Sequence, residues 1–191
     1  MNFNSAKIFT LSNSLSFLRL LLVFPIWYSL NNFPENTYRI ITFALCIIAA
    51  ITDFLDGYFA RKRNEITELG KIIDPLADKI LIAVIAIKLY LMGEVSSYYL
   101  LIIIVRDLII LTGGILISYQ LKKVLPSNLL GKITVTVIGI VFLLVILGLS
   151  KQSLLLLIFY YGSVILIYGS VLGYAIRAFE FLKKSRQYEH L

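Results

Sequence analysis

The 191-residue chain is 59% hydrophobic and 15% charged, and its formal net charge is +7 at pH 7. So large an apolar share excludes an ordinary soluble domain and indicates an integral membrane protein. The basic balance is best explained by membrane topology and contact with anionic lipid, because no basic patch interleaved with aromatic residues suggests nucleic-acid binding.

The predicted elements begin with MNFNSAKIFTLSN, a polar opening that lacks the features of a signal peptide and could form a short interfacial helix. Six apolar runs follow, each about long enough to cross a bilayer as a helix. Short connections without a visible repeat predict one all-α membrane domain over 1–191. Its six transmembrane helices are expected at about 14–32, 38–60, 71–92, 96–121, 129–149 and 153–178.

Basic residues gather at those helix ends that would share one side of the membrane. By the positive-inside rule, both termini and the even-numbered connections are therefore expected to be cytoplasmic. The residues concerned flank the second connection (Arg61, Lys62, Arg63, Lys71), the fourth (Lys122, Lys123, Lys132) and the C-terminal end (Arg177, Lys183, Lys184, Arg186).

Four of the five aspartates lie in two pairs around the second connection. Asp53 and Asp56 are three residues apart, and Asp74 and Asp78 are four apart, so on helices each pair projects from one face. An antiparallel hairpin would let the two acidic faces meet. Four carboxylates near a bilayer need compensation, and two hard divalent cations, Mg²⁺ or Mn²⁺, would provide it while leaving positions open for a substrate phosphate.

The aspartates could also have a role without phosphate chemistry. They could form ion pairs with neighbouring basic residues, although Asp53 lies about two turns inside its predicted span. They could instead line the path of a cation or proton-coupled transporter. A transporter would not by itself require Gly57, Ala60, Arg61 and Gly70 at fixed distances, whereas small residues clear space for a diphosphate and an arginine can bind it.

These residues together match a known signature, Asp-x-x-Asp-Gly-x-x-Ala-Arg, eight residues, then Gly-x-x-x-Asp-x-x-x-Asp. Over residues 53–78 the chain resembles the CDP-alcohol phosphatidyltransferase family at every specified position. The stretch NSLSFLR, residues 13–19, is similar to the Asn-x-Leu-Thr-x-x-Arg opening of some members, with Ser16 in place of the threonine.

The resemblance implies transfer of a phosphatidyl group from CDP-diacylglycerol to an alcohol, with release of CMP, at a site facing the cytoplasm. It implies that Asp78 is the base, that a homodimer forms, and that Arg19 either approaches the nucleotide or supports helix packing. The implied metal ligands are Asp53, Asp56, Asp74 and Asp78, and the implied CDP-binding residues are Asp53, Asp56, Gly57, Ala60, Arg61, Gly70 and Asn13.

The run DPLADK, residues 74–79, is similar to the phosphatidylglycerophosphate synthases, which use glycerol 3-phosphate, and to the cardiolipin synthases of the same superfamily. We expect the former, with a cardiolipin-synthase-type or other alcohol acceptor as the alternative. Lys79, Arg106 and Lys132 are the candidate acceptor-binding cations. Arg106 could instead pair with Asp107, since an arginine at membrane depth requires a partner.

Overall fold

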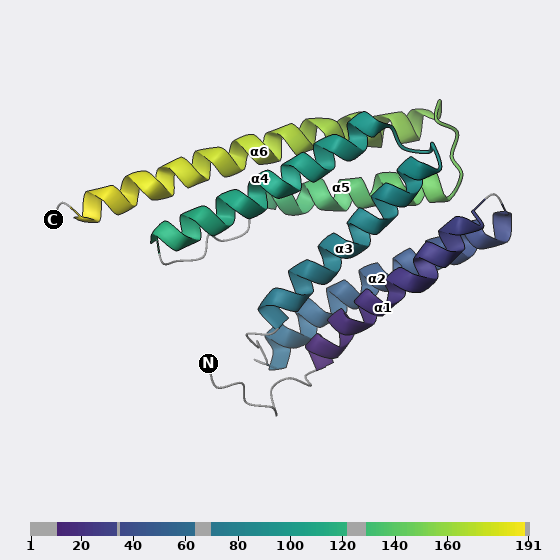
Figure 1. Cartoon of the computed structure of the whole chain (residues 1–191), viewed down its shortest axis with the longest axis horizontal. Helices are drawn as coiled ribbons and strands as arrows, with labels where there is room; N and C mark the ends of the chain where they lie inside the picture. The colour runs from purple at the N-terminus through teal and green to yellow at the C-terminus, as the bar shows by residue number, and fades with distance from the viewer. Residues whose placement is uncertain (1–10, 34, 64–69, 122–128, 190–191) are drawn as a thin grey trace. The chain divides into compact units, whose positions relative to one another are not determined.

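The computed structural model is all-helical throughout the residues that it describes, 11–33, 35–63, 70–121 and 129–189 (Figure 1). Within these ranges, side chains are described except at 11–12, 56–63, 70–75, 115–121 and 182–189. The predicted interfacial helix at the N-terminus lies outside the described residues. The helices are α1 (Leu11–Asn31), α2 (Asn36–Arg63), α3 (Gly70–Leu91), α4 (Ser97–Leu121), α5 (Leu129–Ile146) and α6 (Leu154–Glu189).

The six predicted helices are confirmed, and five of them are long and apolar enough to cross a membrane. The sixth, α3, is described with side chains only over 76–91, which is too short a stretch for this comparison, and its 22 residues include Lys71, Asp74, Asp78, Lys79 and Lys88. At a rise of about 1.5 Å per residue it is roughly 33 Å long, enough for the hydrocarbon core. Five of its residues are charged.

Two helices end in a glycine with left-handed backbone geometry, Gly93 after α3 (φ 73°) and Gly148 after α5 (φ 80°). The residue after each glycine donates its amide to a carbonyl five positions back: Glu94 to Leu89 at 2.9 Å, and Leu149 to Leu144 at 3.2 Å. This is the Schellman arrangement, which satisfies carbonyls at a helix end and favours glycine because a Cβ is disfavoured there.

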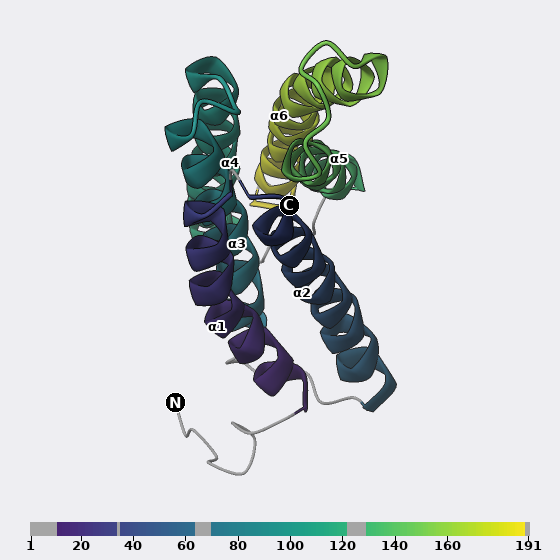
Figure 2. The ribbon, with the colours of Figure 1, turned by 90° about the vertical axis from the view of Figure 1, so that its right-hand side faces the viewer.

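The chain forms two compact units, and the first contains α1, α2 and α3 together with Ile146–Gly148. Within it α1 packs against both other helices, as the two views show (Figures 1 and 2). The Thr42 hydroxyl lies 2.8 Å from Ser29 Oγ, which joins α2 to α1, and Lys88 of α3 bonds to Asn31 and lies over the Trp27 ring. The apolar core of this unit includes Ile26, Leu30, Ala49, Ala77, Ile85 and Leu89.

The second unit contains α4, α5 as far as Val145, and α6, and α4 packs along α6. Tyr99 is fully buried there, and its hydroxyl lies 2.6 Å from Ser163 Oγ. Its ring meets those of Phe142 and Tyr160 at centroid distances of 6.4 and 4.6 Å. Hydrophobic packing and a few short side-chain hydrogen bonds therefore hold this unit together, as is usual between membrane helices.

Large apolar side chains are exposed on many of the helices. Phe24, Leu154 and Ile165 are 73%, 74% and 72% exposed. In water such a surface would promote aggregation, whereas acyl chains solvate it without penalty. The outward side chains therefore agree with the five membrane-length helices in identifying an integral membrane protein.

Candidate active site

Two of the four predicted aspartates meet at one atom of a third side chain. Nη1 of Arg19, on α1, lies 3.2 Å from Oδ1 of Asp53, on α2. The same nitrogen donates a hydrogen bond to Oδ1 of Asp78, on α3. Because both carboxylates approach one nitrogen, the acidic faces of α2 and α3 come together at these two residues.

The fold places these three side chains at similar depth in the first unit. The chain reverses direction at each connection, so α1 and α3 begin at the end where α2 finishes (Figure 1). From the rise of about 1.5 Å per residue, Arg19, Asp53 and Asp78 each lie roughly 12–15 Å from that helix end. The cluster therefore lies well inside the three helices, and nearer to this end than to the other.

Burial differs sharply within the cluster. The Arg19 side chain is 1% exposed, whereas those of Asp53 and Asp78 are 53% and 39% exposed. The Arg19 side chain is therefore buried, whereas both aspartate side chains keep exposed surface that a ligand can reach. Oxygen donors of this kind suit Mg²⁺ or Mn²⁺.

The described side chains supply only part of the predicted metal set. Among them no group of three or more Asp, Glu, His or Cys is close enough to hold an ion. Asp56 and Asp74 lie in α2 and α3, but their side chains are outside the described residues. Helical geometry puts each about one turn from its partner, Asp53 or Asp78, on the same face. The carboxylates of Asp53 and Asp78 have the chemistry that a divalent cation prefers, and all four metal ligands stay predictions.

The predicted CDP-binding residues are distributed over α1, α2 and α3. Asn13, on α1, is buried. Four others lie in the last part of α2 and one at the start of α3, and of their side chains nothing is described (Asp56, Gly57, Ala60 and Arg61; Gly70). Lys79, a predicted acceptor residue, is half-buried and follows Asp78 directly.

Arg19 is the residue for which the sequence left two roles open, nucleotide contact and helix packing. Among the side chains that the structure describes, it is the largest that is fully buried, and it contacts both aspartates. A signal was present in its spacing, because Asn13, Ser16 and Arg19 recur every three residues and all three are buried. A polar stripe on an otherwise apolar helix indicates a face turned toward protein.

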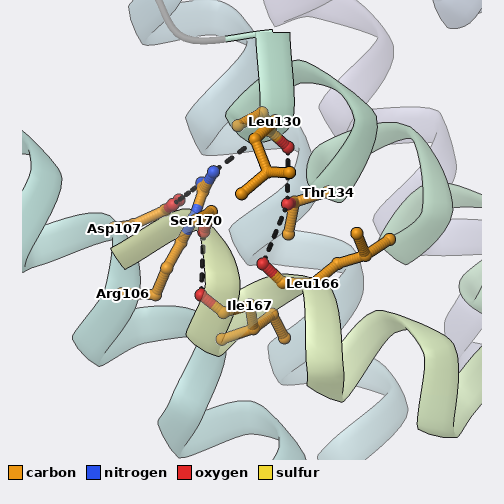
Figure 3. Close-up of polar contacts among 8 residues, drawn as sticks. Arg106, Asp107, Leu130, Thr134, Leu166, Ile167 and Ser170 are labelled. Atoms are coloured by element: carbon orange, nitrogen blue, oxygen red, sulfur yellow. Dashed lines mark hydrogen bonds and ion pairs between the residues drawn. The ribbon is translucent and has the colours of Figure 1, made fainter. Parts of the chain in front are cut away.

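The second unit contains another buried arginine, Arg106 of α4 (Figure 3). Its Nη1 lies 2.5 Å from Asp107 Oδ1, so the predicted alternative pairing is present. In addition Nε donates to Ser170 Oγ of α6 at 3.2 Å, and Nη2 donates to the Gly131 carbonyl of α5 at 3.1 Å. All three guanidinium nitrogens therefore have partners, and together they join the three helices of this unit.

A second polar contact supports the same junction (Figure 3). The hydroxyl of Thr134, which is fully buried, lies 2.7 Å from the Leu130 carbonyl and 3.2 Å from the Leu166 carbonyl of α6. Lys132, which lies between Leu130 and Thr134 on α5, is exposed. Arg106 thus reaches the carbonyl of the residue before Lys132, while the lysine side chain itself points to the surface.

Comparison with known proteins gives a consistent result over nearly the whole chain. The family profile for CDP-alcohol phosphatidyltransferase matches residues 9–174. A Rickettsia typhi protein is 31% identical over 179 residues, 93% of this chain and 98% of its own, and one from Aquifex aeolicus is 30% identical over 178 residues, 90% and 97%. A Mycoplasma genitalium protein is 41% identical over 100 residues, but these are 51% of this chain and 42% of that protein.

All three relatives are named CDP-diacylglycerol–glycerol-3-phosphate 3-phosphatidyltransferase. The profile spans the helix that carries Arg19 and both helices that carry the paired aspartates. A membrane-embedded carboxylate cluster and a match over most of the chain lead to the same assignment: the protein is a member of the CDP-alcohol phosphatidyltransferase family.

Proposed function

We propose that the protein transfers the phosphatidyl group of CDP-diacylglycerol to glycerol 3-phosphate, forming phosphatidylglycerophosphate and CMP. The observation that carries this proposal is the meeting of Asp53 and Asp78, from two consecutive helices, at Arg19 of a third. Partial exposure of both carboxylates suits a substrate with a water-soluble headgroup and lipid tails. The activity is also the one for which the similar proteins are named.

In this proposal Asp78 acts as the general base. Its carboxylate takes the proton of the acceptor hydroxyl, and the hydroxyl oxygen forms a bond to the phosphorus that carries the diacylglycerol oxygen. The bond from that phosphorus to the oxygen bridging to the cytidine phosphate breaks, and CMP departs with the electron pair. Asp78 suits this role because its half-exposed carboxylate can meet a substrate from outside the helix core.

Asp53, Asp56, Asp74 and Asp78 are the proposed ligands of two divalent cations, Mg²⁺ or Mn²⁺. Bound there, the cations would supply electrostatic stabilisation of the negative charge on the diphosphate and on departing CMP. Gly57, Ala60, Arg61, Gly70 and Asn13 complete the proposed CDP-binding residues. The small side chains leave space near the backbone, and the arginine offers two donors to phosphate.

Lys79, Arg106 and Lys132 are the proposed candidate cations for binding the acceptor phosphate. Lys132 is exposed and therefore accessible to a charged substrate. Three of the five N–H donors of Arg106 have partners, so a phosphate could take a remaining donor or replace one of these partners. Asp107 is the partner most suited to exchange, because its side chain is 29% exposed and can be hydrated when released.

We further propose that α3 is the sixth membrane span and that both units form one membrane domain. The length of α3 and its packing on α1 support the first point, and the profile match across both units supports the second. The excess of basic residues favours a cytoplasmic active site and cytoplasmic termini. A homodimer, implied by the family resemblance, stays a prediction that light scattering of the purified protein would test.

The direct experiment measures CMP release by the purified protein with CDP-diacylglycerol and Mg²⁺ or Mn²⁺. Glycerol 3-phosphate, phosphatidylglycerol, inositol phosphate and serine are supplied separately. We expect stimulation by glycerol 3-phosphate alone. Stimulation by phosphatidylglycerol instead would indicate a cardiolipin-synthase-type enzyme. If the folded protein releases no CMP with any of the four acceptors, the proposal is contradicted. Ion flux across sealed vesicles would then favour the transporter alternative.

Two variants separate the proposed roles of the aspartates. Asp78→Asn should abolish turnover while largely retaining metal-dependent binding of the CDP-lipid, because an amide keeps an oxygen ligand but is no base. Asp56→Asn should weaken both turnover and binding. Turnover like that of the wild type in Asp78→Asn would exclude this residue as the base.

A further inference from the structure

Arg19 is placed where it can control how the carboxylate cluster binds cations. A charged side chain at this depth is costly unless it is paired, and Arg19 is 1% exposed. Its Nη1 contacts Asp53 and Asp78 through the same oxygen of each, Oδ1. The two helices that supply the acids are thus joined through a cation from a third helix.

A divalent cation bound by Asp53 and Asp78 needs lone pairs on these same carboxylates. Carboxylate oxygens that accept hydrogen bonds from a guanidinium are less available to a metal ion. The guanidinium and a metal ion bound to the same carboxylates would also repel each other. Arg19 and a divalent ion are therefore competitors for the two aspartates.

We propose that Arg19 is a built-in counter-cation of the aspartate cluster, which binds Asp53 and Asp78 before the divalent cation does and yields them when it arrives. It is a positioning residue: it holds the acids together against their mutual repulsion and lowers their affinity for metal. This inference rests on the metal-dependent function proposed above. The rival possibility is a fixed structural pair, which metal binding leaves in place.

The first unit offers a matched control. Lys88 of α3 also joins α3 to α1, through Asn31 and the Trp27 ring, but at the other end of these helices. Removing either cation costs an α1–α3 contact. Of these two residues, Arg19 contacts the aspartates and Lys88 does not. Only the removal of Arg19 should therefore change metal binding.

The experiment compares full-length wild type, Arg19→Met, Arg19→Gln and Lys88→Met, purified in detergent and stripped with EDTA. Mn²⁺ binding is measured from the electron paramagnetic resonance signal of free Mn²⁺, and thermal unfolding is followed with EDTA and with saturating Mn²⁺. Arg19→Met should unfold at lower temperature in EDTA yet bind Mn²⁺ at least about fivefold more tightly, the lower end of typical coupling between sites.

The stabilisation by Mn²⁺ should correspondingly be larger in Arg19→Met than in the wild type, because tighter binding to the folded state gives more stability. Lys88→Met should lose stability equally with and without Mn²⁺ and keep its affinity. Arg19→Gln should show the same increase in Mn²⁺ affinity. It replaces Arg19→Met in the comparison if Arg19→Met does not fold.

If both Arg19 variants bind Mn²⁺ no more tightly than the wild type, and the wild type does bind Mn²⁺, the proposed role of Arg19 as a counter-cation is wrong. The proposed function would be unaffected. If the wild type itself bound no Mn²⁺ or Mg²⁺, the metal-dependent function would fail, and the inference with it.

Discussion

Replacing Gly148 by alanine should destabilise the protein more than the same change at Gly93. Both glycines have left-handed backbone angles, φ 80° and 73°. An alanine there costs about 1–2 kcal/mol in the native state. Lower entropy of the unfolded chain offsets about 0.4–1 kcal/mol of this. Gly93→Ala, whose Cβ would meet nothing within 4 Å, should therefore cost about 1 kcal/mol net.

Gly148 carries an additional cost because a Cβ at this position would collide with the Arg39 guanidinium. Arg39 is held by a hydrogen bond from Nε to the Phe33 carbonyl, 3.3 Å, and by its position 4.6 Å from the Phe33 ring centroid. Moving it should lose about 1–2 kcal/mol from the hydrogen bond and the cation–π contact. Gly148→Ala should thus cost about 2–3 kcal/mol in total, with the backbone term included.

The assay is thermal or denaturant unfolding in detergent, followed by circular dichroism and by the fluorescence of Trp27. A double-mutant cycle with Arg39→Gln isolates the collision, because the shorter side chain removes it while the backbone angle stays the same. In the Arg39→Gln background the two glycine variants should cost equal amounts. The reasoning would be refuted if the two glycine variants lost equal stability in the wild-type background. It would also be refuted if Gly148→Ala still lost more stability than Gly93→Ala, by the same amount, in the Arg39→Gln background.

Three further outcomes follow from the second unit and from the proposed site. Arg106→Met should lower stability by about 1–3 kcal/mol in an unfolding titration, because two interhelical hydrogen bonds and the Asp107 pair are lost. Tyr99→Phe should lower it by about 0.6 kcal/mol and leave the KM for both substrates unchanged, since it removes one interhelical hydrogen bond. Lys132→Met should raise the KM for glycerol 3-phosphate severalfold without changing stability. Lys151→Met, also an exposed lysine on the surface, is its control and should leave KM unchanged.

The fold was predictable to the extent that it depends on hydropathy. Apolar runs long enough to cross a bilayer gave all six helices, with ends mostly within a few residues of those observed. The longest departure is α6, which continues to Glu189 although the apolar run ends near 178. There the sequence becomes basic and polar, and helical propensity rather than hydropathy extends the helix.

The site was predictable where local spacing determines it and not where packing does. The i,i+3 and i,i+4 spacings of the aspartates, on two consecutive helices, indicated that Asp53 and Asp78 could meet. That Arg19 lies between them depends on the rotation of α1 about its own axis, which only tertiary contacts fix. Likewise the adjacent Asp107 was an evident partner for Arg106, whereas Ser170 and Gly131 are distant in sequence and reach it only through packing.

The charges of α3 have a consequence for how the protein enters the membrane. Each aspartate or lysine near the centre of an inserting helix costs about 2.5–3.5 kcal/mol at the translocon, and α3 carries five charged residues. We therefore expect α3 alone to insert poorly. Arg19 of α1 is synthesised before α3 and pairs with Asp78 in the folded protein. We expect this pair to offset part of the cost of inserting α3. Glycosylation mapping should show efficient insertion of α3 behind α1 and α2 and reduced insertion behind α1 with Arg19→Met. If so, α1 assists the membrane insertion of α3, the helix that bears the proposed base.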